Sequence, residues 1–168
     1  MAMPEFAIRH AMEADLAAVQ DCLVETWHAT YDPIFGVAEV TETSGRWHAI
    51  EVLRAQLTEP DSAFLVAEAA TAIIGTALAR QTAPSHVKLG RLYVRPRHQG
   101  RGIGKALLAA AIAPFSEVTR IELEVEPRNM AAIKFYEARG FALMSAQDSC
   151  GGDPAHSSVV YERRMLPR

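Results

Sequence analysis

The chain has 168 residues, of which 49% are hydrophobic and 22% charged, and its formal net charge at pH 7 is -3. This length and composition predict one globular domain over residues 1–168 with a sizeable core. The mildly acidic balance argues against nucleic acid as a partner, and no apolar run approaches the roughly 20 residues that a membrane span needs.

The first half of the chain predicts a strand, two helices and a strand pair. Apolar and polar residues alternate around Ile8, which favours a short strand. Helical spacing of apolar residues follows over residues 16–27 and again over residues 47–57. Residues 63–70 and 73–80 then favour two strands joined by a short turn.

The second half predicts a long strand over residues 86–94 and then a helix from Ile103 to just before Pro114. Residues 121–125 alternate between apolar residues and glutamates, so that Glu122, Glu124 and Glu126 are expected on one face of a strand.

Asn129 is suited to cap a helix that Gly140 ends, and strands follow from Phe141 and over residues 157–166, separated by a loop at 149–158. The expected order is βααβββαβαββ, a mixed α/β fold.

A glycine-rich, cationic loop joins the third long strand to the helix after it. Gly100, Gly102 and Gly104 lack the Cβ that would hinder a close approach of the backbone to a ligand. Consecutive amides at a helix N-terminus bind phosphate groups, and Arg101 and Lys105 add positive charge. The loop therefore predicts a site for a small phosphorylated ligand.

Two motifs resemble those of the GNAT-type N-acetyltransferases. Residues 99–104, Q-G-R-G-I-G, match the family signature Q/R-x-x-G-x-G/A, and residues 129–141 resemble its motif N-x-x-A-x-x-x-Y-E-x-x-G-F. The resemblance implies a single-domain GNAT fold, with a mixed central sheet whose parallel strands 4 and 5 splay apart between flanking helices. It also implies acetyl-CoA as the acyl donor.

By this resemblance, backbone groups near Leu92 and Val94 pair with the pantetheine arm, and the loop amides hold the pyrophosphate. An amide near Val94 could also hold the oxyanion that develops during transfer. The implied cofactor-binding residues are Leu92, Tyr93, Val94, Gln99, Gly100, Arg101, Gly102, Ile103, Gly104, Lys105, Asn129 and Tyr136.

Tyr136 occupies the family position whose hydroxyl protonates the departing CoA thiolate, although a tyrosine there could also simply pack in the core. Glu124 and its surroundings resemble the ribosomal-protein N-terminal acetyltransferases, in which that glutamate deprotonates the amine. Neighbouring glutamates could raise its pKa by like-charge repulsion. A solvated surface carboxylate is the alternative, with a water chain or His28 then acting as the base.

Trp27 and Tyr31 resemble the W-x-x-x-Y segment that lies between the first two helices of many small family members and borders the acceptor pocket. Their rings could hold the substrate, and Asp32, Glu39 and Glu42 could attract a cation. The alternative is that Trp27 is a core residue of the first helix and that the acids are solvated.

The leading hypothesis is an acetyl-CoA-dependent N-acetyltransferase that acts directly on a primary amine of a small molecule or peptide. A non-catalytic acyl-CoA-binding sensor of the same fold is the alternative. A nucleotide-binding P-loop is disfavoured because Gly104 and Lys105 are followed by Ala106 and position 99 is Gln.

Cys22 and Cys150 form no redox or disulfide framework, and the histidines lack metal-ligand spacing. We therefore expect a cytoplasmic enzyme without a metal, whose partner is its amine acceptor, and which could form a homodimer.

Overall fold

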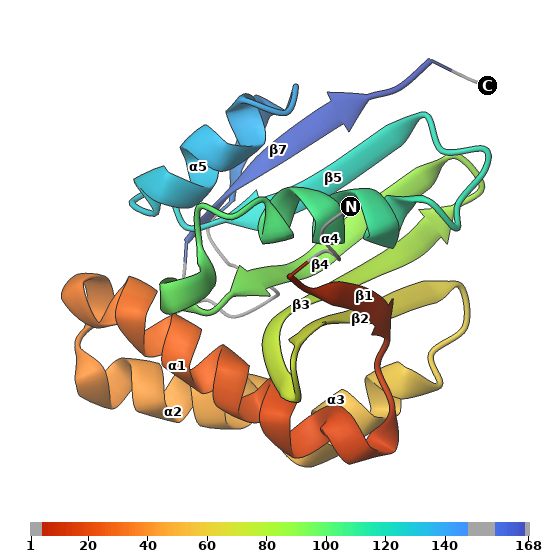
Figure 1. The fold of residues 1–168 in the computed structure, drawn as a ribbon. Helices are drawn as coiled ribbons and strands as arrows, with labels where there is room; N and C mark the ends of the chain where they lie inside the picture. Colours follow the sequence, from red (N-terminus) through yellow and green to blue (C-terminus); the bar gives the residue numbers. More distant parts are fainter. Residues whose placement is uncertain (1–4, 148–156, 167–168) are drawn as a thin grey trace. The chain divides into compact units, whose positions relative to one another are not determined.

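The computed structural model describes residues 5–147 and 157–166, and its strands form a mixed sheet in the order β1-β2-β3-β4-β5-β7-β6 (Figure 1). The strands are β1 (Ala7–His10), β2 (Ser62–Ala69), β3 (Ala72–Ala83), β4 (His86–Val94), β5 (Arg120–Val125), β6 (Ala142–Gln147) and β7 (Ser158–Arg164). The α-helices are α1 (Leu16–Phe35), α2 (Val37–Trp47), α3 (Ile50–Leu57), α4 (Ile103–Ile112) and α5 (Met130–Glu137), and 3-10 turns lie at Glu13–Asp15 and Pro96–His98. The predicted α/β class is confirmed.

β4 and β5 pair in parallel, whereas β1 with β2, β5 with β7 and β6 with β7 pair antiparallel. The parallel register runs from His86 opposite Arg120 to Leu89 opposite Leu123, and β4 then continues to Val94. The predicted parallel relation of the fourth and fifth strands is therefore confirmed.

Three helices, rather than the predicted two, separate β1 from β2. α1 continues for 20 residues through Trp27, Tyr31 and Pro33, so the W-x-x-x-Y segment lies inside a helix and not between helices. The apolar stripe extends one further turn because Tyr31 follows Trp27 at i+4 and is buried. Pro33 falls in the last turn, where it has no amide to donate to the carbonyl of residue 29, and Gly36 with φ +87° ends the helix three residues later.

The chain divides into two compact units that share the long strands β3 and β4. The first unit holds the described residues up to Ala79 and Arg91–Pro114, and the second holds Arg80–Gly90 and the described residues from Phe115 onward. The single domain predicted from the chain length stays a prediction.

The core of the first unit lies where α1 and α3 pack on β2 and β3. Its cluster contains Leu16, Val19, Leu23, Leu53, Phe64, Val66, Ile73 and Leu78. Both α3 and α4 contact β2, whose five central residues are all buried. Burial on both faces explains why this strand has a continuous apolar sequence rather than an alternating one.

In the second unit, β5 alternates as predicted. Ile121, Leu123 and Val125 are buried, and Glu122 and Glu124 lie on the opposite face. Glu126 differs from the prediction because β5 ends at Val125. Its carboxylate accepts hydrogen bonds from the backbone amide and Nε of Arg128, within the turn that precedes α5.

The predicted start and end of α5 are both confirmed. The Oδ1 atom of Asn129 accepts a hydrogen bond from the amide of Ala132 at 3.2 Å and so caps the first turn. Gly140 adopts φ +85°, the left-handed conformation that glycine tolerates at a helix C-terminus. The predicted loop at 149–158 lies almost entirely outside the described residues.

Gly75 of β3 allows a close approach inside the first unit. A Cβ on this residue would lie 3.0 Å from the backbone oxygen of Tyr93 and 3.0 Å from Cδ1 of Leu107. We expect Gly75→Ala to lower the free energy of unfolding in urea by about 1–3 kcal/mol, because the added methyl overpacks the core.

Gly45 in α2 is the matched control, since a Cβ there meets nothing within 4 Å. Gly45→Ala should raise the stability by up to about 1 kcal/mol through helix propensity. Equal stabilities for the two variants would contradict the close approach at Gly75.

Candidate active site

The glycine loop between β4 and α4 requires glycine for its backbone conformation. Gly100 adopts φ +77° and Gly102 adopts φ +80°, the left-handed region that other residues enter only with strain. A Cβ at either position would meet nothing within 4 Å. Glycine is therefore required at these two positions by the left-handed conformation, and the space above the backbone is open.

The amides of this loop form a set of open donors. The first amide bonded in the α4 ladder is that of Ala106, which donates to the carbonyl of Gly102 at 3.0 Å. Within the described part of the chain, the amides of residues 100–105 donate to no acceptor. Arg101 and Lys105 add charge to the positive end of the helix dipole. This donor set fits a phosphate or pyrophosphate group.

Two side chains, Gln99 of the motif and Arg95 before it, hold the loop in place. Gln99 donates from Nε2 to the carbonyl of Val94 at 3.0 Å, which fastens the loop to the end of β4. Arg95 donates from its backbone amide to the carbonyl of Ile74 and from Nε to that of Ile73, both at 2.8 Å. The sequence analysis missed Arg95, because its partners are far away in the chain.

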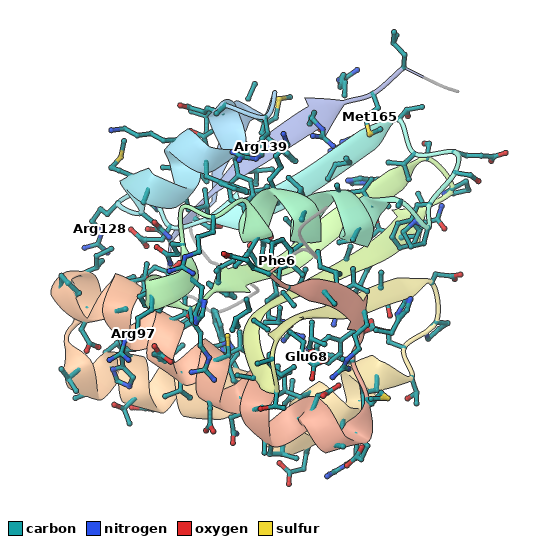
Figure 2. All side chains as sticks on the ribbon, viewed as in Figure 1. Phe6, Glu68, Arg97, Arg128, Arg139 and Met165 are labelled. Atoms are coloured by element: carbon teal, nitrogen blue, oxygen red, sulfur yellow. The ribbon has the colours of Figure 1, made fainter. Side chains whose placement is uncertain are left out.

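Arg95 also forms an ion pair with Glu25 of α1. Glu25, Arg95, Arg97 and His98 line an open surface pocket of about 420 Å3 beside the loop. Figure 2 labels Arg97 among them. Three of these four side chains carry basic groups.

The predicted acceptor residues Trp27 and Tyr31 lie in one aromatic cluster of the first unit. Each is only 7% exposed, with ring centroids 4.9 Å apart. Trp47 and His48 pack edge-on against Trp27 at 5.3 and 5.0 Å. The Nε1 donor of Trp27 is buried without a hydrogen-bond partner among the described residues. The cluster thus combines tight packing with one unsatisfied donor.

His48 is a neutral residue inside this cluster. Burial, with a further contribution from the positive charge of Arg91, lowers the pKa of His48 to about 3. Its Nδ1 lies 2.9 Å from the hydroxyl of Ser44. Arg91 itself is buried, with its guanidinium 4.6 Å from the ring centre of Phe64.

His28 and Asp32 form a pair on α1, with 2.8 Å between Nδ1 and Oδ1. Both side chains are 28% exposed. A carboxylate that orients an imidazole is a common arrangement for a general base. Of the acids expected to attract a cation, Asp32 is therefore already paired, and Glu39 accepts a hydrogen bond from Thr43 within α2.

Cys22 is fully buried in α1, and burial raises the pKa of its thiol to about 11. A protonated thiol without access to solvent is a poor nucleophile. Cys150 lies outside the described residues.

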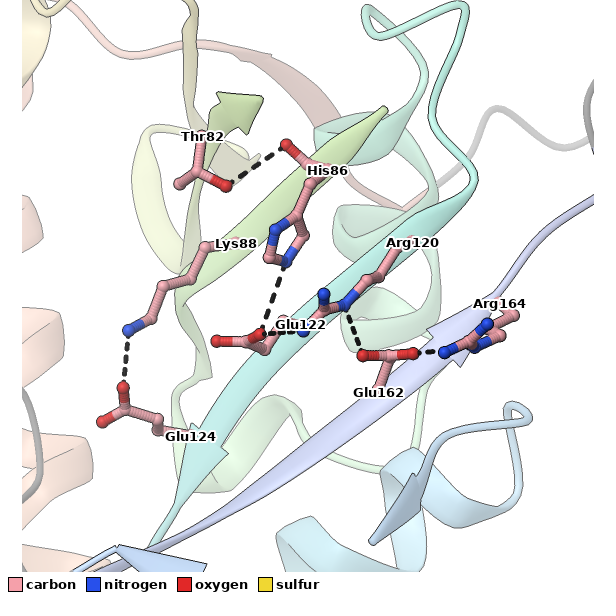
Figure 3. Close-up of polar contacts among 8 residues, drawn as sticks. All are labelled: Thr82, His86, Lys88, Arg120, Glu122, Glu124, Glu162 and Arg164. Atoms are coloured by element: carbon pink, nitrogen blue, oxygen red, sulfur yellow. Dashed lines mark hydrogen bonds and ion pairs between the residues drawn. The ribbon is translucent and has the colours of Figure 1, made fainter. Parts of the chain in front are cut away.

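In the second unit, Glu124 is bound by a cation. Its Oε1 lies 2.5 Å from Nζ of Lys88 on β4 (Figure 3). Its Oε2 accepts a hydrogen bond from the hydroxyl of Ser158 at 3.4 Å. Glu122 likewise contacts Arg120 and His86. Two of the carboxylates expected to repel one another are therefore each bound by a cation, Glu124 by Lys88 of β4 and Glu122 by Arg120 of β5 itself.

Tyr136 lies on α5 and is 8% exposed, with the rings of Phe135 and Phe141 edge-on at 5.2 and 5.5 Å. Its carbonyl accepts the amides of Arg139 and Phe141 at the end of the helix. Its ring and backbone are thus fixed by the end of α5.

Neither a candidate metal cluster nor a membrane-spanning helix occurs among the described residues. They contain no group of three or more His, Cys, Asp or Glu side chains placed to hold a metal ion. None of the described helices is long and apolar enough to cross a membrane.

One family model and three known proteins are similar to this chain. The model of the acetyltransferase (GNAT) family matches residues 21–141. A mycothiol acetyltransferase of Salinispora tropica is 36% identical over 113 residues, which cover 61% of this chain and 36% of that protein. This chain therefore matches only about a third of that relative's length.

An uncharacterised N-acetyltransferase of Mycobacterium tuberculosis is 32% identical over 112 residues, covering 66% of this chain and 72% of that protein. Among solved structures, the PaiA N-acetyltransferase of Thermoplasma acidophilum in complex with coenzyme A has a TM-score of 0.84 at 24% identity. It covers 98% of this chain and 100% of that one. At this identity the likeness shows the fold.

The buried neutral His48 predicts a loss of stability in acid. Its folded pKa of about 3 lies below the ordinary value of 6.5, so between these values the unfolded chain binds a proton that the folded chain does not. From pH 6.5 to pH 5 this should lower the free energy of unfolding by about 2 kcal/mol.

Urea unfolding at pH 7 and pH 5 measures the effect, and His48→Gln should remove this part of the pH dependence. The same loss in both proteins would show that His48 is not its source.

Proposed function

Because the chain belongs to the GNAT family of acetyltransferases, we propose that it transfers an acetyl group from acetyl-CoA directly to a primary amine of a small molecule or peptide. The observation that carries this proposal is the row of open amides at residues 100–105, in the loop that bears the family motif. Acetyl-CoA contains a pyrophosphate that such donors bind, and its thioester supplies the activated acetyl group.

The donor-binding roles follow the family motif residue by residue. The amides of residues 99–105 would hold the pyrophosphate, and backbone groups of Leu92, Tyr93 and Val94 would pair with the pantetheine arm. Asn129 would contact the arm further along. The left-handed conformations of Gly100 and Gly102 support the first of these assignments, since they leave open the space above the backbone.

Tyr136 is the proposed general acid. A phenol keeps its proton near neutral pH and can donate it as negative charge develops on the departing sulfur. The fixed backbone and the flanking rings support this role because they restrict the orientation of the side chain. The buried, protonated Cys22 supports direct transfer without an acyl-cysteine intermediate.

The acceptor amine must lose a proton before it attacks, since the pKa of a primary amine is about 8–10. We assign this proton to the carboxylate of Glu124, directly or through water. The pair of His28 and Asp32 is the alternative base. Trp27 and Tyr31 would border the acceptor, and the unsatisfied Nε1 of Trp27 supports a polar contact there.

The ion pair between Lys88 and Glu124 favours the alternative function, an acyl-CoA-binding sensor. A carboxylate that stays bound to a lysine takes up no proton from a substrate. Both functions include binding of the acyl-CoA donor, and only the acetyltransferase turns it over. In either case we propose a cytoplasmic protein, and the homodimer stays a prediction.

The deciding experiment is to incubate the purified protein with acetyl-CoA and a panel of amino acids, polyamines, aminoglycosides and short peptides while following the release of free thiol. Acceptor-dependent release would support the enzyme. Tight binding of CoA without such release would support the sensor, and a failure to bind CoA would contradict both.

Tyr136→Phe should lower kcat by about 100-fold or more while the Kd for CoA changes by less than about twofold, because only proton donation is lost. Tyr161→Phe is a matched control in the same unit, since that hydroxyl donates to Glu137 at 3.2 Å and has no proposed catalytic role. Steady-state kinetics and calorimetric titration of CoA measure both effects. An unchanged kcat for Tyr136→Phe would contradict the assignment.

A further inference from the structure

One face of the second unit carries a row of ion pairs across β4, β5 and β7 (Figure 3). Glu162 pairs with Arg120 and with Arg164, at 3.0 Å for the latter. Arg120 also binds Glu122 at 2.9 Å, and the Lys88 and Glu124 pair lies further along the same strands. Each of the three carboxylates on this face is thus matched by a cation from the protein itself.

Because these carboxylates are already paired with cations, this face is poorly suited to a polyamine acceptor. A polyamine needs carboxylates that the protein leaves uncompensated, whereas here a polycation would have to displace lysine or arginine from carboxylates that are largely covered. The side chains of Glu122, Glu124 and Glu162 are only 16%, 11% and 3% exposed. Breaking such pairs without replacing the cation is costly.

The pair at Lys88 differs from the other pairs of this face in its number of partners and in its position. Arg120 and Arg164 are more exposed than Lys88, at 45% and 81%, but both bind Glu162 rather than Glu124. Arg120 is shared between two carboxylates, which holds it from both sides. Lys88 is 38% exposed, its carboxylate partner is Glu124, and an ammonium on a flexible stem can turn toward a new anion. Lys88 is therefore the cation of this face that can both reach a ligand and stay near Glu124.

A lysine beside a glutamate is complementary to a molecule that carries both an amine and a carboxylate. We propose that Lys88 is a specificity-determining residue that selects such a zwitterionic acceptor. The acceptor's ammonium binds Glu124, its carboxylate binds Lys88, and the four charges alternate in sign. This inference rests on the proposed function, in which Glu124 receives the proton of the acceptor amine.

The exchange also explains how the ion pair is compatible with turnover. When the acceptor's carboxylate takes over Lys88, Glu124 becomes available to the acceptor's ammonium. An amine without an anionic group offers Lys88 no new partner. Lys88 then stays bound to Glu124, and the amine must compete with Lys88 for the Glu124 carboxylate. The protein's own pair thus acts against amines of the wrong charge.

The test uses two sets of acceptors that differ only in charge. The first set is alanine, alaninamide and 1,2-diaminopropane, and the second is 4-aminobutanoate, 4-aminobutanamide and 1,4-diaminobutane. Thiol release from acetyl-CoA gives kcat and KM for each acceptor. We expect the carboxylate to have the highest kcat/KM within at least one set.

Lys88→Met should lower kcat/KM for the carboxylate about tenfold or more, mainly through KM, because a site built for an anionic group then lacks its partner. Lys88→Glu should shift the preference toward the diamine, and Lys88→Arg should largely retain the wild-type order. Arg164→Met, which removes an 81% exposed cation of the same face, is the control and should leave the order unchanged. Circular dichroism verifies that each variant is folded.

The outcomes separate this inference from the proposed function. Turnover with a diamine or amide as the best member of both sets, or an unchanged order in Lys88→Met, would overturn the inference and leave the acetyltransferase intact. Absence of turnover with every amine, despite binding of CoA, would overturn both. A carboxylate preference that depends on the charge at position 88 would support both.

Discussion

The site depends on a loop whose amides stay open while its ends are held. Unpaired amides at the start of a helix bond to water until a ligand replaces it, and a loop whose ends are held keeps these amides in one arrangement. Here Gln99 binds the carbonyl of Val94, and Arg95 binds the carbonyls of Ile73 and Ile74. These contacts, together with the left-handed glycines, preorganise the donors for an anion.

The second unit depends on a different constraint, which is the pairing of opposite charges on one face of the sheet. Period-two alternation puts the carboxylates of β5 on one face, where Lys88 of β4 binds Glu124 and Arg120 of β5 itself binds Glu122. The result is a site in which Glu124 is held by Lys88 and Ser158 rather than isolated. The chemistry of acceptor recognition would therefore depend on exchanging one ion pair for another.

Local signals predicted much of the fold, and contacts between distant residues account for what they missed. The bounds of β4, the cap at Asn129 and the left-handed Gly140 follow from short-range preferences. α1 continues through Pro33, a residue that ordinarily ends a helix, and the burial of Tyr31 against other aromatic residues accompanies this extension. Likewise, Lys88 is 36 residues from Glu124, so the sequence identified the carboxylate but not its partner.

The ion pair between Glu25 and Arg95 has a thermodynamic consequence within the first unit. It joins α1, the helix that carries Trp27 and Tyr31, to the first residue after β4. A ligand that binds at the loop and favours one arrangement of this ion pair also changes the affinity of the Trp27 and Tyr31 surface for its own ligand. By linkage the effect is reciprocal and equal in free energy. Cooperativity between two ligands could therefore arise from one surface contact, without any change of fold.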